Sequence, residues 1–497
     1  MKSAGKTITT AFALAGAAAS LLSCASPDMQ DDVTTVSSTP TQALSADGQY
    51  ISWKEHLIDG EELGGVPIQG GDGLQMADLD LDGYLDIVSV HEADVVYGQS
   101  TEGYVRIAFG SENPDEWELV TLAEGKEAAA AEDASIGDLN NDGYPDIIVA
   151  CELAHLLYLQ NPGDDIRQGA RWQRVIPDVS RNRGSYIRVF FADFNDDSRL
   201  EVVAANKGEQ SPSLQSARLY PISLFQAPDD PLDSSGWVER ELTQVLTPIN
   251  SRPVDLDGDG DLDILGGSRF ESRMLWLENL GTGEIQFREH RIEVAGRSVP
   301  WRAREMHLTG MNVAFLDVNG DGRLDIFTQE TFSKLIWLEQ PEEPSSPWQI
   351  HPIGSIFPDH GVGVAVGDLN QDGHLDVLVG SYSRGPRDQD GPEVTKDHPV
   401  GRIAWFQNPG SETEAWVRHD ITRRKRGMYD QLILLDLDGD GDLDCTGTRG
   451  NSARFDGVFW VEQVRTQSPA AAFQPARQQE SEELALTSNG LEWEEPD

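Results

Sequence analysis

The residues best suited to chemistry in this sequence are two identical, aspartate-rich stretches. The letters DLDGDGDLD run from Asp255 to Asp263 and return from Asp436 to Asp444. In such a stretch the side chains at positions 1, 3, 5 and 9, with the backbone carbonyl of position 7, can form an oxygen shell that suits a hard cation such as Ca²⁺. Without a cation, carboxylates about 4 Å apart repel by roughly 4 kcal/mol per pair at an effective dielectric constant of about 20. We therefore predict a cation in each stretch.

The two stretches belong to a set of seven repeats. The pattern D-x-[DN]-x-D-[GS]-x-x-[DE] begins at residues 78, 138, 193, 255, 317, 368 and 436, at intervals of 51 to 68 residues. Position 6 is glycine in six of these copies, which permits a sharp turn. The predicted metal ligands, at positions 1, 3, 5 and 9, are Asp78, Asp80, Asp82, Asp86, Asp138, Asn140, Asp142, Asp146, Asp193, Asn195, Asp197, Glu201, Asp255, Asp257, Asp259, Asp263, Asp317, Asn319, Asp321, Asp325, Asp368, Asn370, Asp372, Asp376, Asp436, Asp438, Asp440 and Asp444.

The composition of the loops narrows the choice of metal and ranks the copies. No His or Cys occupies a ligand position, so zinc is not expected. An EF-hand would need Glu at position 12, where the first copy has Ser89. We expect up to seven Ca²⁺ ions, bound more tightly by the copies with four carboxylates, at 78, 255 and 436, than by copies with Asn at position 3. The third copy has Ser198 in place of Gly and Glu201 in place of the last Asp, so we expect its site to be distorted or empty.

The sequence around each loop predicts the strands that position it. Each copy lies between two short, apolar, β-rich runs, such as MNVAFL before a loop and IVSV after one, so each loop is expected to join two strands. A third strand, such as YVRIAF or MLWLEN, and a fourth that begins with an aromatic residue, such as WELVTL or WQIHPI, complete the interval. Four strands per repeat is the unit of a propeller blade.

The fourth strand of the last repeat is found at the other end of the chain. The last repeat ends after VFWVEQ, whereas WKEHLI, from Trp53 to Ile58, has the fourth-strand pattern and precedes the first loop. The N-terminal strand should therefore complete the last blade, close the ring and remove a free edge. We predict an all-β fold, a seven-bladed β-propeller of four-stranded blades over residues 50–464.

The unit of strand, D-x-[DN]-x-D-G-x-x-D loop and strand resembles the FG-GAP or VCBS repeat of integrin α-subunit propellers and of many secreted bacterial proteins. The resemblance covers the whole predicted propeller. It implies a propeller fold with Ca²⁺ in the loops. Because the activities of that family vary, the resemblance implies fold and metal far better than function.

The two ends of the chain predict export and flexibility. Residues 1–24 have two lysines, an apolar run and the letters LLSC, which are similar to a bacterial lipoprotein signal with Cys24 as the lipidated residue. Ordinary cleavage just past Cys24 is the alternative. Residues 25–49 are predicted to be a flexible tether and residues 465–497 a disordered, acidic tail. We expect a protein exported to the bacterial cell envelope or surface, with a lipid anchor as its only contact with the membrane.

The charge of the chain excludes one class of partner. The formal net charge is −47, from 38 Lys and Arg against 85 Asp and Glu. Because nucleic-acid binding needs many phosphate contacts from Lys and Arg, we expect no nucleic-acid partner. Apart from Cys24 at the signal, the chain has only Cys151 and Cys445, so the fold is not a disulfide scaffold, and we expect a monomer.

The face opposite the predicted metal loops is expected to bind the ligand. Its connections are rich in arginine, as in ITRRKRGMYD, and would attract an acidic ligand; in the alternative, each Arg pairs with a nearby Asp or Glu. The residue five positions before the first aspartate of a loop is polar in five of the seven repeats. These residues could form a polar ring at the channel mouth, or they could be polar because they contact solvent in an open channel. The predicted ligand-binding residues are Asp133, Arg188, Asn250, Asn312, Gln431 and Arg426.

The histidines divide into structural and candidate catalytic residues. His56, His290, His351 and His419 each follow the aromatic residue of a fourth strand by three positions, so we expect them to be structural. A His or Tyr base beside an Arg that neutralises a uronate carboxylate would suit polysaccharide β-elimination. The candidates are His307, His360, Tyr186, Tyr429 and Arg188, and no motif selects among them.

These observations leave two functions open. The leading prediction is a calcium-stabilised binding or adhesion module at the cell surface, whose partner is an acidic polysaccharide or a surface protein. The alternative is a polysaccharide lyase on the same scaffold. No G-x-S-x-G, P-loop or H-E-x-x-H motif is present, which argues against a serine hydrolase, a nucleotide-binding protein and a zinc protease.

Overall fold

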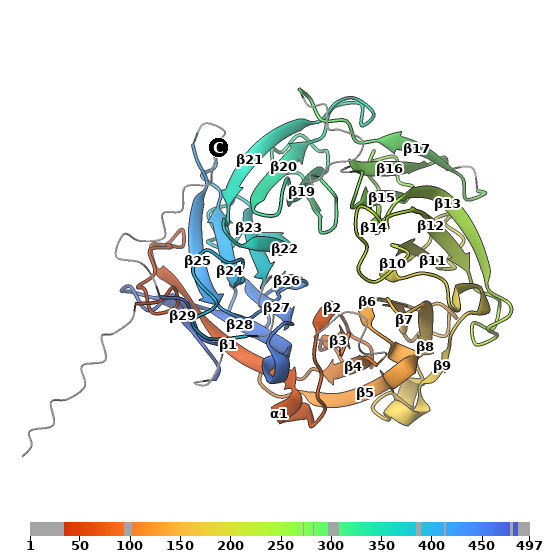
Figure 1. The fold of residues 1–497 in the computed structure, drawn as a ribbon, viewed down its shortest axis with the longest axis horizontal. Coiled ribbons are helices and arrows are strands. Elements are labelled where there is room, and N and C mark those ends of the chain that lie inside the picture. The colour runs from red at the N-terminus through yellow and green to blue at the C-terminus, as the bar shows by residue number, and fades with distance from the viewer. Residues whose placement is uncertain are drawn as a thin grey trace, which may run out of the picture. The chain divides into compact units, whose positions relative to one another are not determined.

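The computed structural model describes residues 34–93, 102–271, 273–281, 283–296, 308–383, 389–411, 414–477 and 481–485. These residues belong to one compact unit that begins at Thr34. Their strands form seven sheets, arranged as a ring in which first strands such as β2, β10 and β22 lie innermost (Figure 1). The predicted seven-bladed β-propeller is therefore confirmed.

Six of the sheets contain four strands in chain order. The first two blades are β2 (Gly71–Ala77), β3 (Asp86–His91), β4 (Tyr104–Phe109) and β5 (Glu118–Glu124), then β6 (Ala131–Gly137), β7 (Asp146–Cys151), β8 (His155–Gln160) and β9 (Gln173–Val175). The next two are β10 (Tyr186–Ala192), β11 (Glu201–Asn206), β12 (Leu219–Gln226) and β13 (Val238–Leu246), then β14 (Pro248–Val254), β15 (Asp263–Ser268), β16 (Arg273–Asn279) and β17 (Phe287–Arg291). The fifth and sixth are β18 (Ala314–Leu316), β19 (Asp325–Gln329), β20 (Lys334–Glu339) and β21 (Gln349–Ser355), then β22 (His360–Gly367), β23 (Asp376–Tyr382), β24 (Gly401–Gln407) and β25 (Val417–Arg424).

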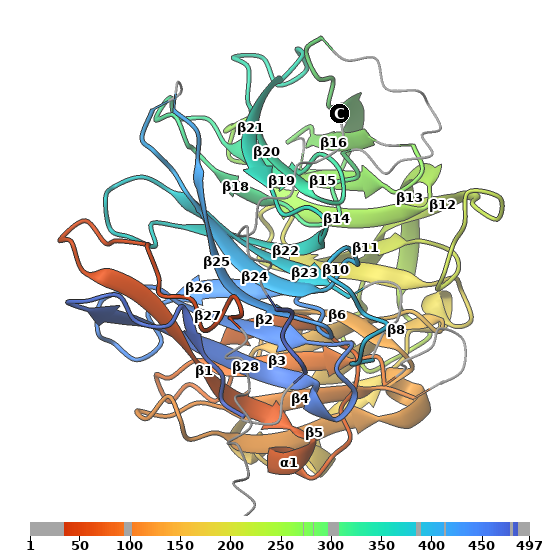
Figure 2. The same cartoon turned by 60° about the vertical axis from the view of Figure 1, so that its left-hand side comes forward.

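The seventh blade closes the ring with a strand from the N-terminal end. Its order is β26 (Leu432–Leu435), β27 (Asp444–Arg449), β28 (Gly457–Thr466), β1 (Tyr50–Gly60) and β29 (Phe473–Gln474). β1 pairs antiparallel with β28 over its length, and the two strands lie side by side in Figure 2. A short helix, α1 (Glu61–Gly64), follows β1. The fourth-strand pattern around Trp53 thus identified the strand that closes the ring.

Apolar contacts between neighbouring blades form the core. One cluster joins Leu265 and Trp276 of the fourth blade to Ile326 and Leu338 of the fifth, and comparable clusters lie between other blades. Cys151 and Cys445 are free and buried. Among the described residues, no helix is long and apolar enough to cross a membrane.

Parts of the segments that flank the propeller contact its blades. Before the propeller, Val36 and Ala43 are buried, and a backbone bridge joins Pro40 to Ala471. After it, β29 pairs with β1, and Leu484 is buried against the sixth blade's long connection. A few apolar side chains in each segment pack against the last two blades. They are too few to change the polar average composition from which flexibility was predicted. The predicted signal, Cys24 and residues 486–497 lie outside the described residues.

A buried ion pair fixes the closing strand to the sixth blade. Glu55 of β1 accepts two hydrogen bonds from Arg424 of β25, each 3.0 Å long. Both side chains are almost fully buried. Burial opposes ionisation of Glu55, yet the Arg424 guanidinium lowers its pKa to about 2. The pair therefore ties the N-terminal strand to the rest of the ring.

Glu55→Gln should destabilise the protein strongly, because the Arg424 guanidinium would face a neutral amide. Breaking one side of a buried pair costs about 3–5 kcal/mol, so the midpoint of thermal unfolding should fall by roughly 5–10 °C. The folded pKa of Glu55 is about 2 against an ordinary value of 4.5, so the pair's contribution is present above pH 4.5 and lost as the pH falls toward 2. The control is Glu61→Gln at an exposed position of α1. Equal midpoints for the two variants at pH 7 would contradict the role of the pair.

Candidate metal loops and central channel

The ninth residue of each loop is a buried carboxylate that holds the loop to its blade. Asp86 accepts the N–H of Leu79 in its own loop at 2.9 Å and the N–H of Gly110, just after the third strand, at 3.0 Å. The same pair of hydrogen bonds is made by Asp146, Asp263, Asp325, Asp376 and Asp444. This carboxylate therefore connects the loop to the end of the third strand.

Burial makes these carboxylates hard to ionise. It raises the pKa of Asp86 to about 6 and those of Asp263 and Asp444 to about 7, and other aspartates of the same loops add to the shift. An adjacent cation would favour the ionised form and lower each pKa. The arrangement is thus electrostatically suited to a bound metal.

The first residue of each loop folds the backbone around the prospective site. In all seven loops its carboxylate accepts the N–H of position 6 at 2.8–3.1 Å. In the third loop Ser198 occupies this position with a φ of 66°, in the left-handed region that glycine occupies in the other loops. The replacement of Gly by Ser, from which we expected distortion, leaves the turn in place.

Three loops bring carboxylate oxygens close enough to share one ion. Oxygens of Asp78, Asp80 and Asp86 lie within 4.8 Å of one another. The same holds within the loops at 255 and 436, for Asp255, Asp257 and Asp259 and for Asp436, Asp438 and Asp444. These are the three copies with four carboxylates, and an oxygen-only donor set of this kind fits Ca²⁺.

The first loop differs from the other two because it has a basic partner. Arg167, from the connection after β8, pairs with Asp80 at 2.5 Å and with Asp82 at 3.4 Å. Its guanidinium also lies 4.7 Å from the ring centre of Phe109. In the loop at 255, by contrast, burial and the neighbouring Asp259 raise the pKa of Asp257. Part of the charge of the first loop is therefore neutralised by the protein itself.

In four blades an amide side chain at the end of the third strand links the blade to the preceding one. Asn279 donates to the carbonyl of Phe194 in the third loop at 2.8 Å and to that of Leu262 in its own loop at 3.1 Å. Equivalent bonds to the second position of the preceding loop come from Asn161, Gln340 and Gln463. Sequence reasoning did not identify these residues, although the recurring Asn or Gln after the third strand was the signal.

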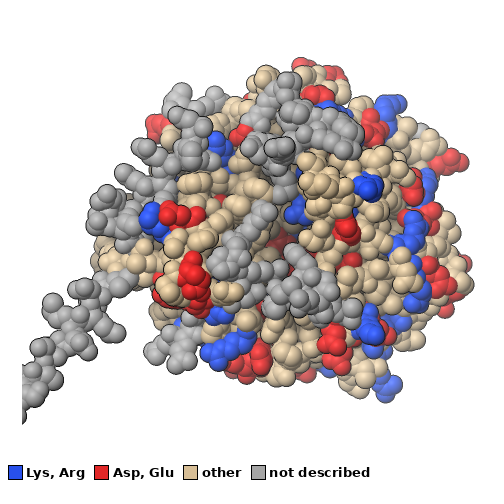
Figure 3. Space-filling view, in the orientation of Figure 1, with Lys and Arg blue, Asp and Glu red and all other residues tan. Residues whose placement is uncertain are grey.

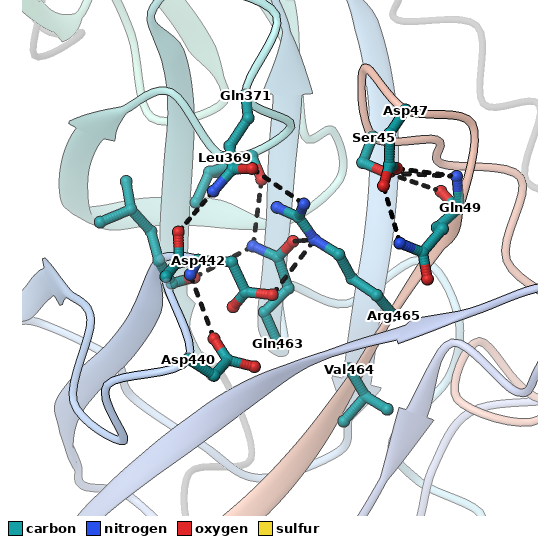
Figure 4. Close-up of polar contacts among 12 residues, drawn as sticks. Ser45, Asp47, Gln49, Leu369, Gln371, Asp440, Asp442, Gln463, Val464 and Arg465 are labelled. Carbon is teal, nitrogen blue, oxygen red and sulfur yellow. Dashed lines mark hydrogen bonds and ion pairs between the residues drawn. The ribbon is translucent and has the colours of Figure 1, made fainter.

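The contact between the last two blades contains further polar groups (Figure 4). Gln463 donates to Leu369 at 3.0 Å, while Arg465 pairs with Asp442 at 3.1 Å and donates to Gln371 at 3.0 Å. Gln371 in turn donates to the carbonyl of Gly441. The loops at 368 and 436 therefore form one connected polar unit.

Bulges at the start of the inner strands aim side chains into the central channel. The pairing of first and second strands shifts register between Tyr186 and Arg188 and between Pro248 and Asn250, and also in the first, second and sixth blades. A bulge of this kind reorients the side chains beside it. Of the positions five residues before the loops, those of the first four blades and the sixth lie at these bulges, whereas Asn312 and Gln431 precede their inner strands.

A hydrogen-bonded network spans the channel at this level. Arg188 of the third blade donates to Asn312 at 3.1 Å and pairs with Asp430 at 3.2 Å. Asn312, before the inner strand of the fifth blade, donates to Asp430, before that of the seventh, at 3.0 Å. Glu132 of the second blade lies 3.7 Å from Arg188. Because its members come from the second, third, fifth and seventh blades, the network crosses the channel axis and obstructs it.

A cavity of about 440 Å³ lies in the channel. Its lining residues run along the inner strands from the network level toward the metal loops, so the cavity is on the metal-loop side of the network. The structure brings together there five of the six predicted ligand-binding residues, namely Asp133, Arg188, Asn250, Asn312 and Gln431. Arg252 and Gln75 also line it and were missed. They stand two positions further along their strands, where the alternation of side chains predicts the same face.

The sixth predicted ligand residue, Arg426, is elsewhere. It pairs with Asp390 at 2.8 Å and stacks over the ring of Phe455. Two arginines of the neighbouring strands also form ion pairs. Arg423 of β25 pairs with Asp359 at 2.8 Å, and Arg402 of β24 pairs with the same carboxylate at 2.6 Å. These arginines therefore pair with acidic side chains of the protein, which is the alternative that the sequence left open.

Acidic groups also lie on the face opposite the metal loops. Oxygens of Asp72, Glu92 and Glu132, three buried residues, are within 4.8 Å of one another. Beside them Lys207 is buried and pairs with Glu152. Figure 3 shows Lys and Arg interspersed with Asp and Glu over one face of the molecule. This mixture is what the alternative predicts, in which the arginines of the connections pair with nearby Asp and Glu.

The candidate catalytic residues do not converge. The Tyr186 side chain is buried among residues of the second and third blades, and that of Tyr429 in the cluster between the sixth and seventh. His360 stacks on Phe332 with ring centres 4.5 Å apart. Of the candidates only Arg188 lines the channel cavity, and none of the described lining residues is His or Tyr. His307 lies outside the described residues.

The four histidines expected to be structural occupy one repeated position. Each stacks on a tryptophan of the neighbouring third strand, with ring centres 4.0–4.6 Å apart. Three of them also contact a glutamate two residues after that tryptophan; His351 and Glu339, for example, are 2.8 Å apart. These contacts join the third and fourth strands of the blade.

Residues 255–328 and 317–379 match the model of the FG-GAP-like repeat. The chain therefore carries FG-GAP-like repeats on a seven-bladed β-propeller, a general type of binding module. No curated protein matches the sequence.

Solved structures resemble the chain at low identity. They include the S. cerevisiae core factor, with 10% identity, a TM-score of 0.46 and coverage of 86% of this chain and 63% of that one. The V. cholerae biofilm matrix protein Bap1 has 11% identity, a TM-score of 0.40 and coverage of 86% and 92%. The K499G mutant of the NanB sialidase from Streptococcus pneumoniae has 10% identity and a TM-score of 0.43, with coverage of 83% of this chain and 71% of that one. At these identities none of their activities transfers to this chain.

Asn279→Ala should destabilise the protein more than Asn408→Ala, because only the first variant loses a bond between blades. Asn408 donates to Leu375 of its own loop at 3.1 Å and accepts the N–H of Gly410, which matches the contacts of Asn279 within its blade. Leaving a buried carbonyl without its donor costs about 1–3 kcal/mol, and urea unfolding should show a difference of that size. Equal free energies of unfolding would contradict the link between blades.

Proposed function

We propose that this protein is an exported, calcium-stabilised β-propeller that serves as a binding or adhesion module at the bacterial cell surface. Its ligand is an acidic glycan, with a surface protein as the second candidate. The observation that carries the proposal is the polar channel cavity, which gathers five residues that the sequence marks as ligand-binding. Attachment through Cys24, at the end of the predicted signal, would hold the module at the membrane.

Calcium is supported by the donor sets of the loops. Seven loops share one backbone turn, and three of them bring carboxylate oxygens within 4.8 Å of one another. When bound, Ca²⁺ would supply positive charge at these carboxylates and cross-link the loop. In the protein itself, the ninth carboxylate connects the loop to its blade, and in four blades an amide at the end of the third strand connects that blade to the preceding loop.

An acidic ligand is supported by the basic groups of the channel. Arg188 and Arg252 are the basic residues among those that line the cavity. Amide side chains of Gln75, Asn250 and Gln431 surround them and can hydrogen-bond to sugar hydroxyls. No described His or Tyr stands there to act as a base, so we expect retention of the glycan without cleavage.

Removal of calcium should lower the stability of the protein markedly. A ligand at 100 times its Kd stabilises by about 2.7 kcal/mol per site, so excess EGTA should lower the thermal midpoint on the order of 10 °C, and added Ca²⁺ should restore it. Asp257→Asn should reduce this shift more than Asp80→Asn, because Arg167 partly neutralises the first loop. An unchanged midpoint together with less than about one calcium per chain by metal analysis would refute the calcium assignment.

The mature protein should be retained on immobilised polygalacturonate or alginate and pass through immobilised dextran, a neutral glycan. Retention should weaken as salt is raised, because charge contributes to the contact. The eluted glycan should carry no new unsaturated ends absorbing in the ultraviolet. Such ends would establish the lyase, and passage through every acidic glycan would refute the glycan ligand.

A further inference from the structure

Arg252 occupies a singular position in the channel. It stands three residues before the fourth loop, and the equivalent residues of the other six blades are uncharged: Gln75, Ser135, Phe190, Ala314, Ala365 and Ile433. Six of the seven blades thus have an uncharged side chain at this level of the channel, and one has a permanent positive charge.

The charge of Arg252 is only partly compensated by the protein. Its Nη1 donates to the carbonyl of Val313 at 3.3 Å, and its guanidinium lies 5.9 Å from the ring centre of Phe315. In the described part of the chain it forms no ion pair, and its side chain is exposed to the cavity. A guanidinium has five N–H donors in a planar fork that matches a carboxylate. Within the described residues one of these donors has a protein acceptor, which leaves the others able to bind a group in the cavity.

The other charged groups of the cavity are already engaged. Arg188 pairs with Asp430, and Asp133 accepts the N–H of Val189 at 3.1 Å. Asp133 is the carboxylate whose charge reaches Arg252, and burial raises its pKa to about 6. An anionic group that enters the cavity thus finds its best partner in Arg252.

The network beyond the cavity limits what can enter. Arg188, Asn312 and Asp430 are joined across the channel axis by contacts of 3.0–3.2 Å. A polymer therefore cannot thread through the ring, and a ligand that reaches Arg252 from the metal-loop side ends against this network. The volume of about 440 Å³ admits a group the size of one or two sugar rings.

We propose that the channel is a blind pocket for the terminal uronic acid residue of an acidic glycan, with Arg252 binding its carboxylate. Gln75 and Gln431 hydrogen-bond to its hydroxyl groups, and Phe190 offers an apolar wall. The network of Arg188, Asn312 and Asp430 forms the floor of the pocket. This inference rests on the proposed glycan-binding function and adds to it that the module recognises chain ends rather than chain interiors.

The test uses calorimetry on the mature, calcium-loaded protein with galacturonic acid and trigalacturonate as probes. Arg252→Gln should weaken binding of both at least tenfold, and Arg252→Lys should fall between, because lysine keeps the charge but not the fork. The matched control is Arg240→Gln, since Arg240 on outer strand β13 likewise donates to one backbone carbonyl, that of Ile285, at 2.7 Å. Thermal midpoints equal to the wild type's would show that the variants are folded.

Selective esterification tests the recognition of ends. Trigalacturonate methyl-esterified only on its central carboxyl should bind like the free trimer, whereas esterification of both terminal carboxyls should abolish binding. Equal binding by the two esters, or by wild type and Arg252→Gln, would overturn the proposal. A peptide with a free C-terminal carboxylate that binds more tightly than galacturonic acid and is lost in Arg252→Gln would overturn the glycan assignment.

The two proposals fail in different ways. If Arg252→Gln is retained on immobilised polygalacturonate as well as the wild type, the glycan-binding function stands and the pocket assignment falls. If the wild type is not retained on any acidic glycan and does not bind the monosaccharide, both fall.

Discussion

The buried carboxylate at the ninth position of the loops is the interaction on which the rest of the propeller depends. In six of the seven loops it accepts one backbone N–H from its own loop and one from the end of the third strand, as Asp263 does with Leu256 and Asn279. Asn279 then reaches the preceding blade through Phe194. Loop, blade and neighbouring blade therefore share one chain of hydrogen bonds. Any ion that fixes the ionisation of this carboxylate also influences the packing between blades.

The fold could be predicted from the sequence because its signals are local and repeated. Spacing identified the seven aspartate-rich loops, and the aromatic residue at Trp53 identified the strand that closes the ring. Serine at position 198 adopts the left-handed turn that glycine adopts in the other loops; that the third site is distorted or empty stays a prediction. The segment that contains Val36 and Ala43 docks on the last blade through a few apolar side chains, which its polar composition hides.

The channel could be predicted only in part. The spacing within a repeat shows which side chains point inward, and five of the predicted residues do line one cavity. It does not show which of them meet across the axis, because Arg188, Asn312 and Asp430 lie in different blades and more than a hundred residues apart. Arginine-rich connections were likewise ambiguous, since Arg423 and Arg426 have acidic partners from distant segments.

The proposed metal and the proposed ligand are connected through their charges. The chain has a formal net charge of −47, so an acidic ligand is repelled at long range, and a basic group must act at short range inside the channel. Seven Ca²⁺ ions would add +14 and bring the total to −33, with all of the added charge in the loops that surround one end of the channel. Because Arg252 lies three residues from the fourth loop, on the same side of the network, calcium in the loops would reduce the repulsion on the path that an anion takes to reach it. A metal that holds the blades together would in this way also admit the ligand.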